Sequence, residues 1–398
     1  VFHLAKFPCE ESENLLLDFI KSDFEQMEFK IAKRKAIEVL AIFNSKKAIP
    51  IIGGFLKSDD PYLLEISIWS LGKLKCNDIY IINQICLLLY KQFDNKRVVI
   101  QTLTNLGIKN EIEKIRLLSK DKKVSNGVRG AALSALVKLA GEEDKISDLK
   151  DFLRLSNQND RHCAVQDIIN AGNISIIPEL IKAPISPSFK IQAIDSLWIE
   201  DSLWIENVNL LNSLDLVIID DPKNINTLEI NYFEKDISFL IEQLFHTDFN
   251  RCYQSMKELE KQSPDEVLYY LNINWDRAKV DYGAIYFFIN TYKILLNKGY
   301  YDKSILHKVD FLLSDNWPDY IKFKSSVIQV LGCLNRIGFY SNFDRFSDER
   351  LTPYWKNRYA ALLSFQTNII KKNKELGELF LNDSNRFVRL KAKQICFN

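Results

Sequence analysis

One pattern recurs about every 32 residues through the first half of the chain, and it restricts the fold more than any other feature. The pattern is a small residue, an aliphatic residue four positions later and usually another apolar residue three positions after that. It occurs at Ala36-Leu40-Phe43, Ser67-Leu71-Leu74, Val99-Leu103-Leu106, Ala132-Leu136-Leu139, Ala164-Ile168-Ala171 and Ala193-Leu197. These spacings place the side chains on one face of a helix. One helix pair cannot bury such a face alone, so the repeat predicts an all-α solenoid of stacked helix pairs, curved, with a concave groove.

The repeats weaken in the middle of the chain, which divides the predicted solenoid into two halves. We expect an N-terminal helical cap at 1–30, a first set of repeats at 31–200, an irregular junction at 201–234 and a second set at 235–398. Within this middle region, residues 195–200 (DSLWIE) recur directly as 201–206. Six extra residues rotate a helix face by about 240°, so both copies cannot point the same face inward on one straight helix.

The composition argues against several classes of protein. The 53 Lys and Arg residues nearly balance the 52 Asp and Glu residues, so no overall charge favours nucleic acid or an anionic membrane. The sequence has no run of about 18 apolar residues and no secretory signal pattern, so no membrane insertion is expected. The seven cysteines are scattered without metal-binding spacing. These features favour a cytoplasmic protein with reduced thiols and no bound metal.

The usual enzyme motifs are missing from the sequence. It has no phosphate-binding loop, no dinucleotide-binding glycine run, no His-Glu-x-x-His and no Gly-x-Ser-x-Gly. A solenoid exposes a long surface that suits an extended ligand or a protein segment. One hypothesis is therefore a non-enzymatic α-solenoid adaptor that binds a protein partner in its groove.

The repeat sequences point to a second hypothesis. Residues 128–139 (VRGAALSALVKL) combine Val-Arg, small residues and closing leucines, and Asp59-Asp60-Pro61 precedes Leu71-Gly72-Lys73-Leu74. An Asp-Pro helix start, Val-Arg and a closing Leu-Gly-x-Leu resemble the HEAT-like repeat of phycobilin lyases of the E/F clan. The aromatic segment 274–288 (NWDRAKVDYGAIYFF) is similar to the members that serve phycoerythrin α subunits. The likeness covers most of residues 30–398.

The resemblance implies a function as well as a fold. A HEAT/armadillo-like solenoid of this family would attach phycoerythrobilin through a thioether to a cysteine of the phycoerythrin α subunit. Some members also isomerise the bilin to phycourobilin, and the sequence leaves both activities open. The implied partners are the bilin substrate and the apoprotein, with no other cofactor and no nucleic acid.

Such an enzyme works mainly by holding its substrate in one shape and presenting it to the acceptor thiol. Arg or Lys would pair with the two propionates, and a carboxylate would bond the pyrrole N–H groups. Aromatic side chains would pack against the rings. An isomerising member also needs a base and an acid to move a proton.

Arg161, His162 and Cys163, near the start of a predicted helix, form the first candidate cluster. Some lyase-isomerases carry a His-Cys pair within Asn-His-Cys-Gln-Gly-Asn, of which only His-Cys matches here. This resemblance implies proton transfer by His162 and Cys163. Arg161, beside them, is a candidate substrate-binding residue. The alternative is that Arg161 is the routine arginine of the repeat and Cys163 a small core residue beside Ala164.

The second candidate cluster lies within the aromatic segment. It consists of Trp275, Asp276, Arg277, Asp281, Tyr282 and Tyr286. Asp276 and Asp281 are candidate catalytic carboxylates, and the other four side chains are candidate bilin-binding groups. The alternative is that Arg277 and Asp281, four residues apart, form a local ion pair and that both tyrosines belong to the core.

Two further tryptophans are candidate stacking groups for the bilin. Trp69 lies in the second repeat, and Trp198 lies in the duplicated segment. Large aromatic residues at helical spacing are more often core residues. We expect the bilin on the concave surface between the two halves, where residues 160–163 and 275–286 would face each other.

Overall fold

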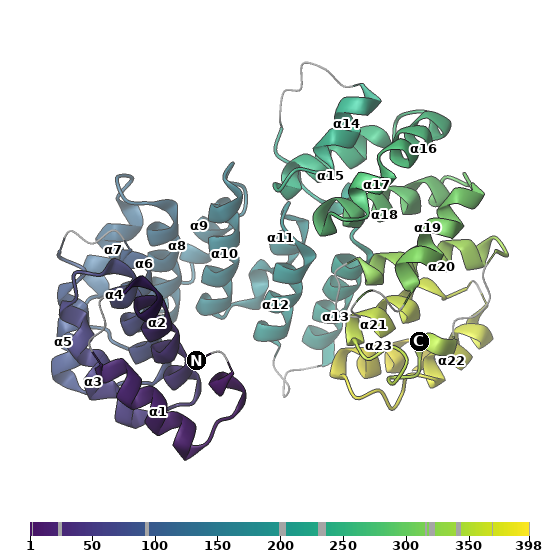
Figure 1. Cartoon of the computed structure of the whole chain (residues 1–398). Coiled ribbons are helices and arrows are strands. Elements are labelled where there is room, and N and C mark those ends of the chain that lie inside the picture. Colours follow the sequence, from purple (N-terminus) through teal and green to yellow (C-terminus); the bar gives the residue numbers. More distant parts are fainter. Residues whose placement is uncertain are drawn as a thin grey trace. The chain divides into compact units, whose positions relative to one another are not determined.

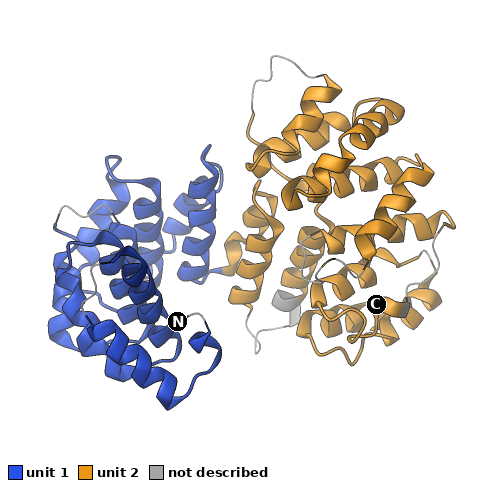
Figure 2. Ribbon diagram, in the orientation of Figure 1, with its two compact units in different colours: residues 1–173 blue, residues 174–398 orange. Residues whose placement is uncertain are grey.

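Every regular element in the structure, a computed structural model, is helical. This holds for the residues that it describes, namely 1, 3–22, 26–91, 95–198, 204–229, 236–314, 317, 323–339, 344–367 and 369–397. The predicted all-α class is therefore confirmed. The chain forms two compact units, residues 1–173 and 174–398, and each is described by itself (Figures 1 and 2).

The first unit is built from helices that alternate between two layers. Its helices are α1 (Glu10–Lys21), α2 (Met27–Ile42), α3 (Ile49–Gly54), α4 (Pro61–Lys73), α5 (Ile79–Leu87), α6 (Lys96–Asn105), α7 (Ile112–Lys120), α8 (Asn126–Ala135), α9 (Lys145–Phe152) and α10 (Gln158–Ala171). The even-numbered helices from α2 to α10 pack side by side in sequence order. They carry the small residues of the repeat, which we call anchors: Ala36, Ser67, Val99, Ala132 and Ala164. All five anchors are fully buried, as the repeat predicts.

The helix starts follow the predicted capping residues. The Asp60 carboxylate accepts hydrogen bonds from the backbone amides of Tyr62 and Leu63 at 3.0 and 3.3 Å, and Pro61 occupies the first turn of α4. Ser125 caps α8 in the same way. These side chains satisfy backbone N–H groups that have no partner within the helix, which fixes where each repeat begins.

An arginine three residues before the anchor stabilises the start of several repeats. The Arg161 guanidinium donates to the carbonyls of Leu155 and Ser156, six and five residues earlier, at 2.7 and 2.9 Å. Arg358 and Arg389 make the same pair of contacts with the carbonyls six and five residues before them. The guanidinium thus binds carbonyls just before the start of its own helix, which fixes the turn that leads from the preceding repeat into this one.

The second unit continues the helical pattern. Its helices are α11 (Ile177–Lys182), α12 (Pro187–Leu197), α13 (Trp204–Ile219), α14 (Ile237–Gln243), α15 (Phe249–Leu259), α16 (Pro264–Ile273), α17 (Trp275–Ala278), α18 (Tyr282–Asn297), α19 (Lys303–Leu313), α20 (Lys324–Arg336), α21 (Trp355–Ser364), α22 (Ile370–Glu378) and α23 (Arg386–Phe397). No helix in the described parts of either unit is long and apolar enough to cross a membrane.

The structure differs from the predicted domain boundaries around the duplicated segment. The compact units divide after residue 173, within the predicted first set of repeats, and residues 204–219 of the predicted irregular junction form α13. Helix α12 ends at Leu197 in the first DSLWIE copy, and α13 begins at Trp204 in the second. Residues 199–203, which separate the two helices, lie outside the described residues. The first copy therefore lies at the end of α12 and the second at the start of α13. Because the copies belong to different helices, they do not have to bury the same face of one helix.

Gly332 permits the close packing of α20 on α21, and replacing it should destabilise the second unit. A Cβ atom at this position would lie 2.5 Å from the backbone oxygen of Ser364. We expect Gly332→Ala to lower the free energy of unfolding by about 1–3 kcal/mol, because the two backbones must separate. Urea denaturation followed by circular dichroism measures this loss. Gly54→Ala is the control, since no atom lies within 4 Å of its Cβ position, and equal stability of both variants would contradict the argument.

Candidate functional site

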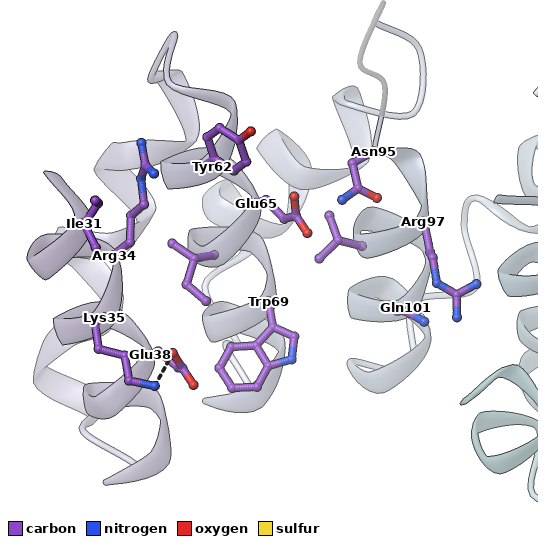
Figure 3. Close-up of a pocket in the computed structure, with 12 residues that line it drawn as sticks. Ile31, Arg34, Lys35, Glu38, Tyr62, Glu65, Trp69, Asn95, Arg97 and Gln101 are labelled. Atoms are coloured by element: carbon purple, nitrogen blue, oxygen red, sulfur yellow. Dashed lines mark hydrogen bonds and ion pairs between the residues drawn. The ribbon is translucent and has the colours of Figure 1, made fainter. Parts of the chain in front are cut away.

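A pocket of about 760 Å³ opens on the first unit across α2, α4 and α6 (Figure 3). Its volume lies within the range of sites that hold small organic ligands. Apolar side chains from all three helices contribute to the lining, among them Ile31, Ile66 and Val98. Trp69 also lines the pocket and is 38% exposed, so one predicted stacking group lies in it.

The lining residues occupy equivalent positions in successive repeats. Residues two positions before the anchor are Arg34, Glu65 and Arg97, and residues two positions after it are Glu38, Trp69 and Gln101. Because the three helices pack in parallel register, equivalent positions gather on one surface. These residues could have been found in the sequence by counting two positions to either side of each anchor. Considered one at a time, most of them look like ordinary polar residues on a helix surface.

Cations on α2 form one side of the pocket. Arg34 pairs with Asp60 at 2.7 Å, and its guanidinium lies 4.8 Å from the centre of the Tyr62 ring. Lys35 pairs with Glu38 at 2.8 Å (Figure 3). The Nε atom of Arg34 is buried and makes no hydrogen bond within the described part of the chain. Two cationic side chains, Arg34 and Lys35, thus line this side of the pocket, where they would attract an anionic ligand.

The opposite side of the pocket is closed by an ion pair that crosses a helix. Arg97 on α6 binds both carboxylate oxygens of Asp167 on α10, at 2.7 and 2.9 Å. Its guanidinium also donates to the carbonyls of Gly127 and Cys163, at 2.6 and 3.2 Å. The stem of Arg97 lines the pocket, while its charged end points away from it (Figure 3). The aliphatic part of Arg97 thus forms one wall of the pocket, and its positive charge is paired with Asp167.

Helix α8 lies beneath this bridge, and a glycine makes room for it. A Cβ atom at Gly130 would lie 2.4 Å from a carboxylate oxygen of Asp167. Any larger side chain at this position would displace the carboxylate. Gly130 thus allows an ion pair between helices that are two repeats apart.

Asp167 should make the stability of the first unit depend on pH. Burial raises its pKa from 3.8 to about 6, although Arg97 lowers it in part. The folded state then holds the proton more tightly than the unfolded chain does. The stability contributed by this group is therefore greatest below pH 3.8 and is lost as the pH rises through about 6. Wild type should lose stability relative to Asp167→Asn over this range, measured by urea denaturation at a series of pH values. A constant difference would contradict the prediction.

His162 and Cys163 lie beside this bridge on α10, outside the pocket lining. His162 is half-buried and stands two residues before its anchor, the position that lines the pocket in α2, α4 and α6. Burial raises the pKa of the Cys163 thiol, so it is not a thiolate at neutral pH. The backbone carbonyl of Cys163 accepts a hydrogen bond from the Arg97 guanidinium. The predicted catalytic pair is therefore connected to the pocket wall.

The structure corrects the prediction that Arg161 binds substrate. Its side chain is fully buried, and it donates to two backbone carbonyls in the turn before its own helix. A guanidinium held in this way is not available to a propionate. The alternative stated from the sequence, a routine repeat arginine, is the one that the structure supports.

The cluster at 275–286 does not gather around one cavity. Asp276 is exposed and pairs with Lys279 at 2.5 Å, whereas Asp281 caps α18 by accepting from the amides of Gly283 and Ala284. Arg277 does not pair with Asp281 but binds both carboxylate oxygens of Glu242, at 2.6 and 2.8 Å. These three charged groups thus have separate structural partners.

The aromatic members of this cluster also separate. Tyr286 is buried and donates to the carboxylate of Asp220, and burial raises its pKa well above the usual value. Tyr282 is exposed, and its ring lies nearly perpendicular to that of Trp317, with centroids 6.0 Å apart. Trp275 packs near Tyr292 in the same unit. Tyr286 is therefore a core residue, and the predicted convergence of these rings on one ligand does not occur within the second unit.

Trp198, the remaining candidate, packs within the second unit. Its ring meets Phe387 edge-on with centroids 5.1 Å apart, and the guanidinium of Arg386 lies 5.7 Å from it. These contacts connect the end of α12 to α23. The position of Trp198 is thus set by packing between helices, and Trp198 does not line the pocket on α2, α4 and α6.

The repeats and the pocket define a helical-repeat protein with an open site of ligand size. The bilin biosynthesis protein CpeY of Synechococcus sp. (strain WH8020) is 33% identical over 98% of this chain and 94% of its own length. The chain therefore belongs to the CpeY family of bilin biosynthesis proteins, and the resemblance to phycobilin lyases drawn from its repeats is confirmed.

Two other comparisons cover large parts of the chain. The uncharacterized phycocyanin operon protein Y of Pseudanabaena tenuis (strain PCC 7409) is 28% identical over 98% of this chain and 90% of that protein. The solved complex of CpcE and CpcF of phycocyanin lyase from Nostoc sp. PCC7120 matches 54% of this chain and 86% of that chain, with 21% identity and a TM-score of 0.47. No family profile matches the sequence.

Proposed function

We propose that this protein is a phycobilin lyase that attaches phycoerythrobilin to a cysteine of the phycoerythrin α subunit. The observation that carries the proposal is the near full-length similarity to a bilin biosynthesis protein. The pocket on α2, α4 and α6 supports it, because its volume suits an open-chain tetrapyrrole. We assign the bilin to this pocket in place of the 275–286 cluster.

The reaction forms one bond and requires little chemistry from the lyase. The acceptor thiol adds to the ethylidene double bond of ring A, so that a carbon–sulfur bond forms, the double bond becomes single and the thiol proton passes to ring A. The protein accelerates this step by holding the bilin in one shape. The indole of Trp69 packs against the rings, and Arg34 and Lys35 attract the two propionates.

Isomerisation to phycourobilin is the further activity that the family resemblance suggests. It moves a double bond and therefore needs one group to remove a proton and another to deliver one. We assign these roles to His162 and Cys163, because they stand beside the Arg97 wall of the pocket. The imidazole can accept or donate a proton near neutral pH.

The test is to produce the protein together with bilin-forming enzymes and one phycoerythrin subunit at a time. The purified α subunit should carry covalent bilin, and its absorption and fluorescence separate phycoerythrobilin from phycourobilin. The β subunit and a culture without this protein are the controls. Bilin attachment no greater than in that culture would contradict the proposal and favour the non-enzymatic adaptor.

A further inference from the structure

One charge in the pocket, the Glu65 carboxylate, has no counter-ion among the residues that the structure describes. Arg34, Lys35 and Arg97 are each paired, with Asp60, Glu38 and Asp167 respectively. Glu65, on the central helix α4, accepts no hydrogen bond and forms no ion pair with any residue that the structure describes. Figure 3 shows its carboxylate between α2 and α6, inside the pocket.

The surroundings of Glu65 make a missing partner significant. Its side chain is half-buried, and apolar Ile66, Trp69 and Val98 line the same pocket. Filling the pocket with a ligand would remove water from the carboxylate, and a desolvated carboxylate without a donor is unfavourable. A ligand that binds here must therefore supply the donor or the positive charge.

We infer that Glu65 is the counter-ion of the bilin nitrogens and that the bilin binds in its protonated, cationic form. This inference rests on the proposed function. A neutral bilin has N–H groups on three rings and an imine nitrogen that can take one proton from water. In the cation all four nitrogens carry hydrogen, so a carboxylate can accept from two of them. The propionates are anions and cannot fill this role.

The position of Glu65 also orients the ligand. Arg34 and Lys35 lie on α2, whereas Glu65 lies on the neighbouring α4. The propionates of the two central rings then point toward α2, and their nitrogens lie over α4. The guanidinium of Arg97 points away from the pocket (Figure 3) and is held by Asp167 and two backbone carbonyls, so Arg97 closes the α6 side without attracting a propionate.

The experiment compares wild type with Glu65→Gln and Glu38→Gln during titration with phycoerythrobilin. Glu38 is the matched control, because it lines the same pocket but is already paired with Lys35. Wild type and Glu38→Gln should give a bilin band shifted to longer wavelength, as protonated bilins do. Glu65→Gln should bind at least about tenfold more weakly, with its band near that of the neutral bilin. Circular dichroism shows whether each variant is folded, and Glu65→Asp should partly restore the shift.

The outcomes separate the inference from the proposed function. If wild type binds the bilin and Glu65→Gln gives the same absorption band and the same affinity, the counter-ion role is overturned. The lyase proposal would then still stand. An equal loss of bilin affinity in Glu65→Gln and Glu38→Gln would also overturn the counter-ion role, because bilin binding would then depend only on the net charge of the pocket. Failure of wild type to bind phycoerythrobilin at all would overturn both.

Discussion

Arg358→Ala should lower the free energy of unfolding by about 3–5 kcal/mol. Arg358 is 1% exposed, binds both carboxylate oxygens of Asp383 at 2.6 and 2.8 Å, and donates to the carbonyls of Thr352 and Pro353. The alanine variant leaves the Asp383 carboxylate buried without its cation, and it leaves two carbonyls without a donor. Urea denaturation monitored by tryptophan fluorescence measures the loss, since Trp355 lies in the same helix.

Arg350 provides the matched control for this prediction. It also binds an aspartate, Asp348, at 2.8 Å, but its side chain is 89% exposed. Exposed ion pairs contribute little because water solvates both charges. Arg350→Ala should leave the unfolding midpoint unchanged within error. A loss of stability similar to that of Arg358→Ala would show that burial is not what makes the repeat arginine important.

Trp69→Ala should weaken phycoerythrobilin binding by about 2 kcal/mol, or roughly thirtyfold, without unfolding the protein. The indole lines the pocket on α4 and is 38% exposed, so the fold does not depend on its complete burial. A bilin that covers the ring would remove most of this apolar surface from water. Spectroscopic titration measures the dissociation constant, and circular dichroism checks the fold.

Trp275→Ala is the comparison that distinguishes the two candidate sites. Trp275 is in the 275–286 cluster of the second unit, where it packs near Tyr292 and Phe311. Its removal should leave the affinity for the bilin unchanged. If both variants are folded and Trp275→Ala loses more bilin affinity than Trp69→Ala, the bilin site would have to be assigned to the second unit.

The helical repeats could be predicted because their pattern reflects local geometry. The anchors from Ala36 to Ala164 are buried, and Asp60 and Ser125 cap the helices that they precede. The boundary between the units was not predictable in this way. Helix α13 forms within a stretch of weak periodicity, because burial against other helices can stabilise a helix that its own pattern does not reveal.

The site was less predictable, because it depends on which residues from different repeats lie side by side. Trp69 was found from its size, whereas Glu65 was missed because a single glutamate on a helix looks solvated. Arg161 and Tyr286 carry suitable chemistry but are buried among their own partners. Whether such a side chain binds a ligand or stabilises the fold depends on contacts that are distant in the sequence.

The bridge from Arg97 to Asp167 also changes how the first unit can open. Repeat proteins couple mainly through nearest neighbours, so single helix pairs can detach one at a time. This ion pair connects α6 with α10 and passes over α8. Helix α8 cannot leave without breaking it, so we expect the three helices to exchange their amide hydrogens as one cooperative block. The α6 side of the adjacent pocket should therefore keep its shape whether or not a ligand is bound.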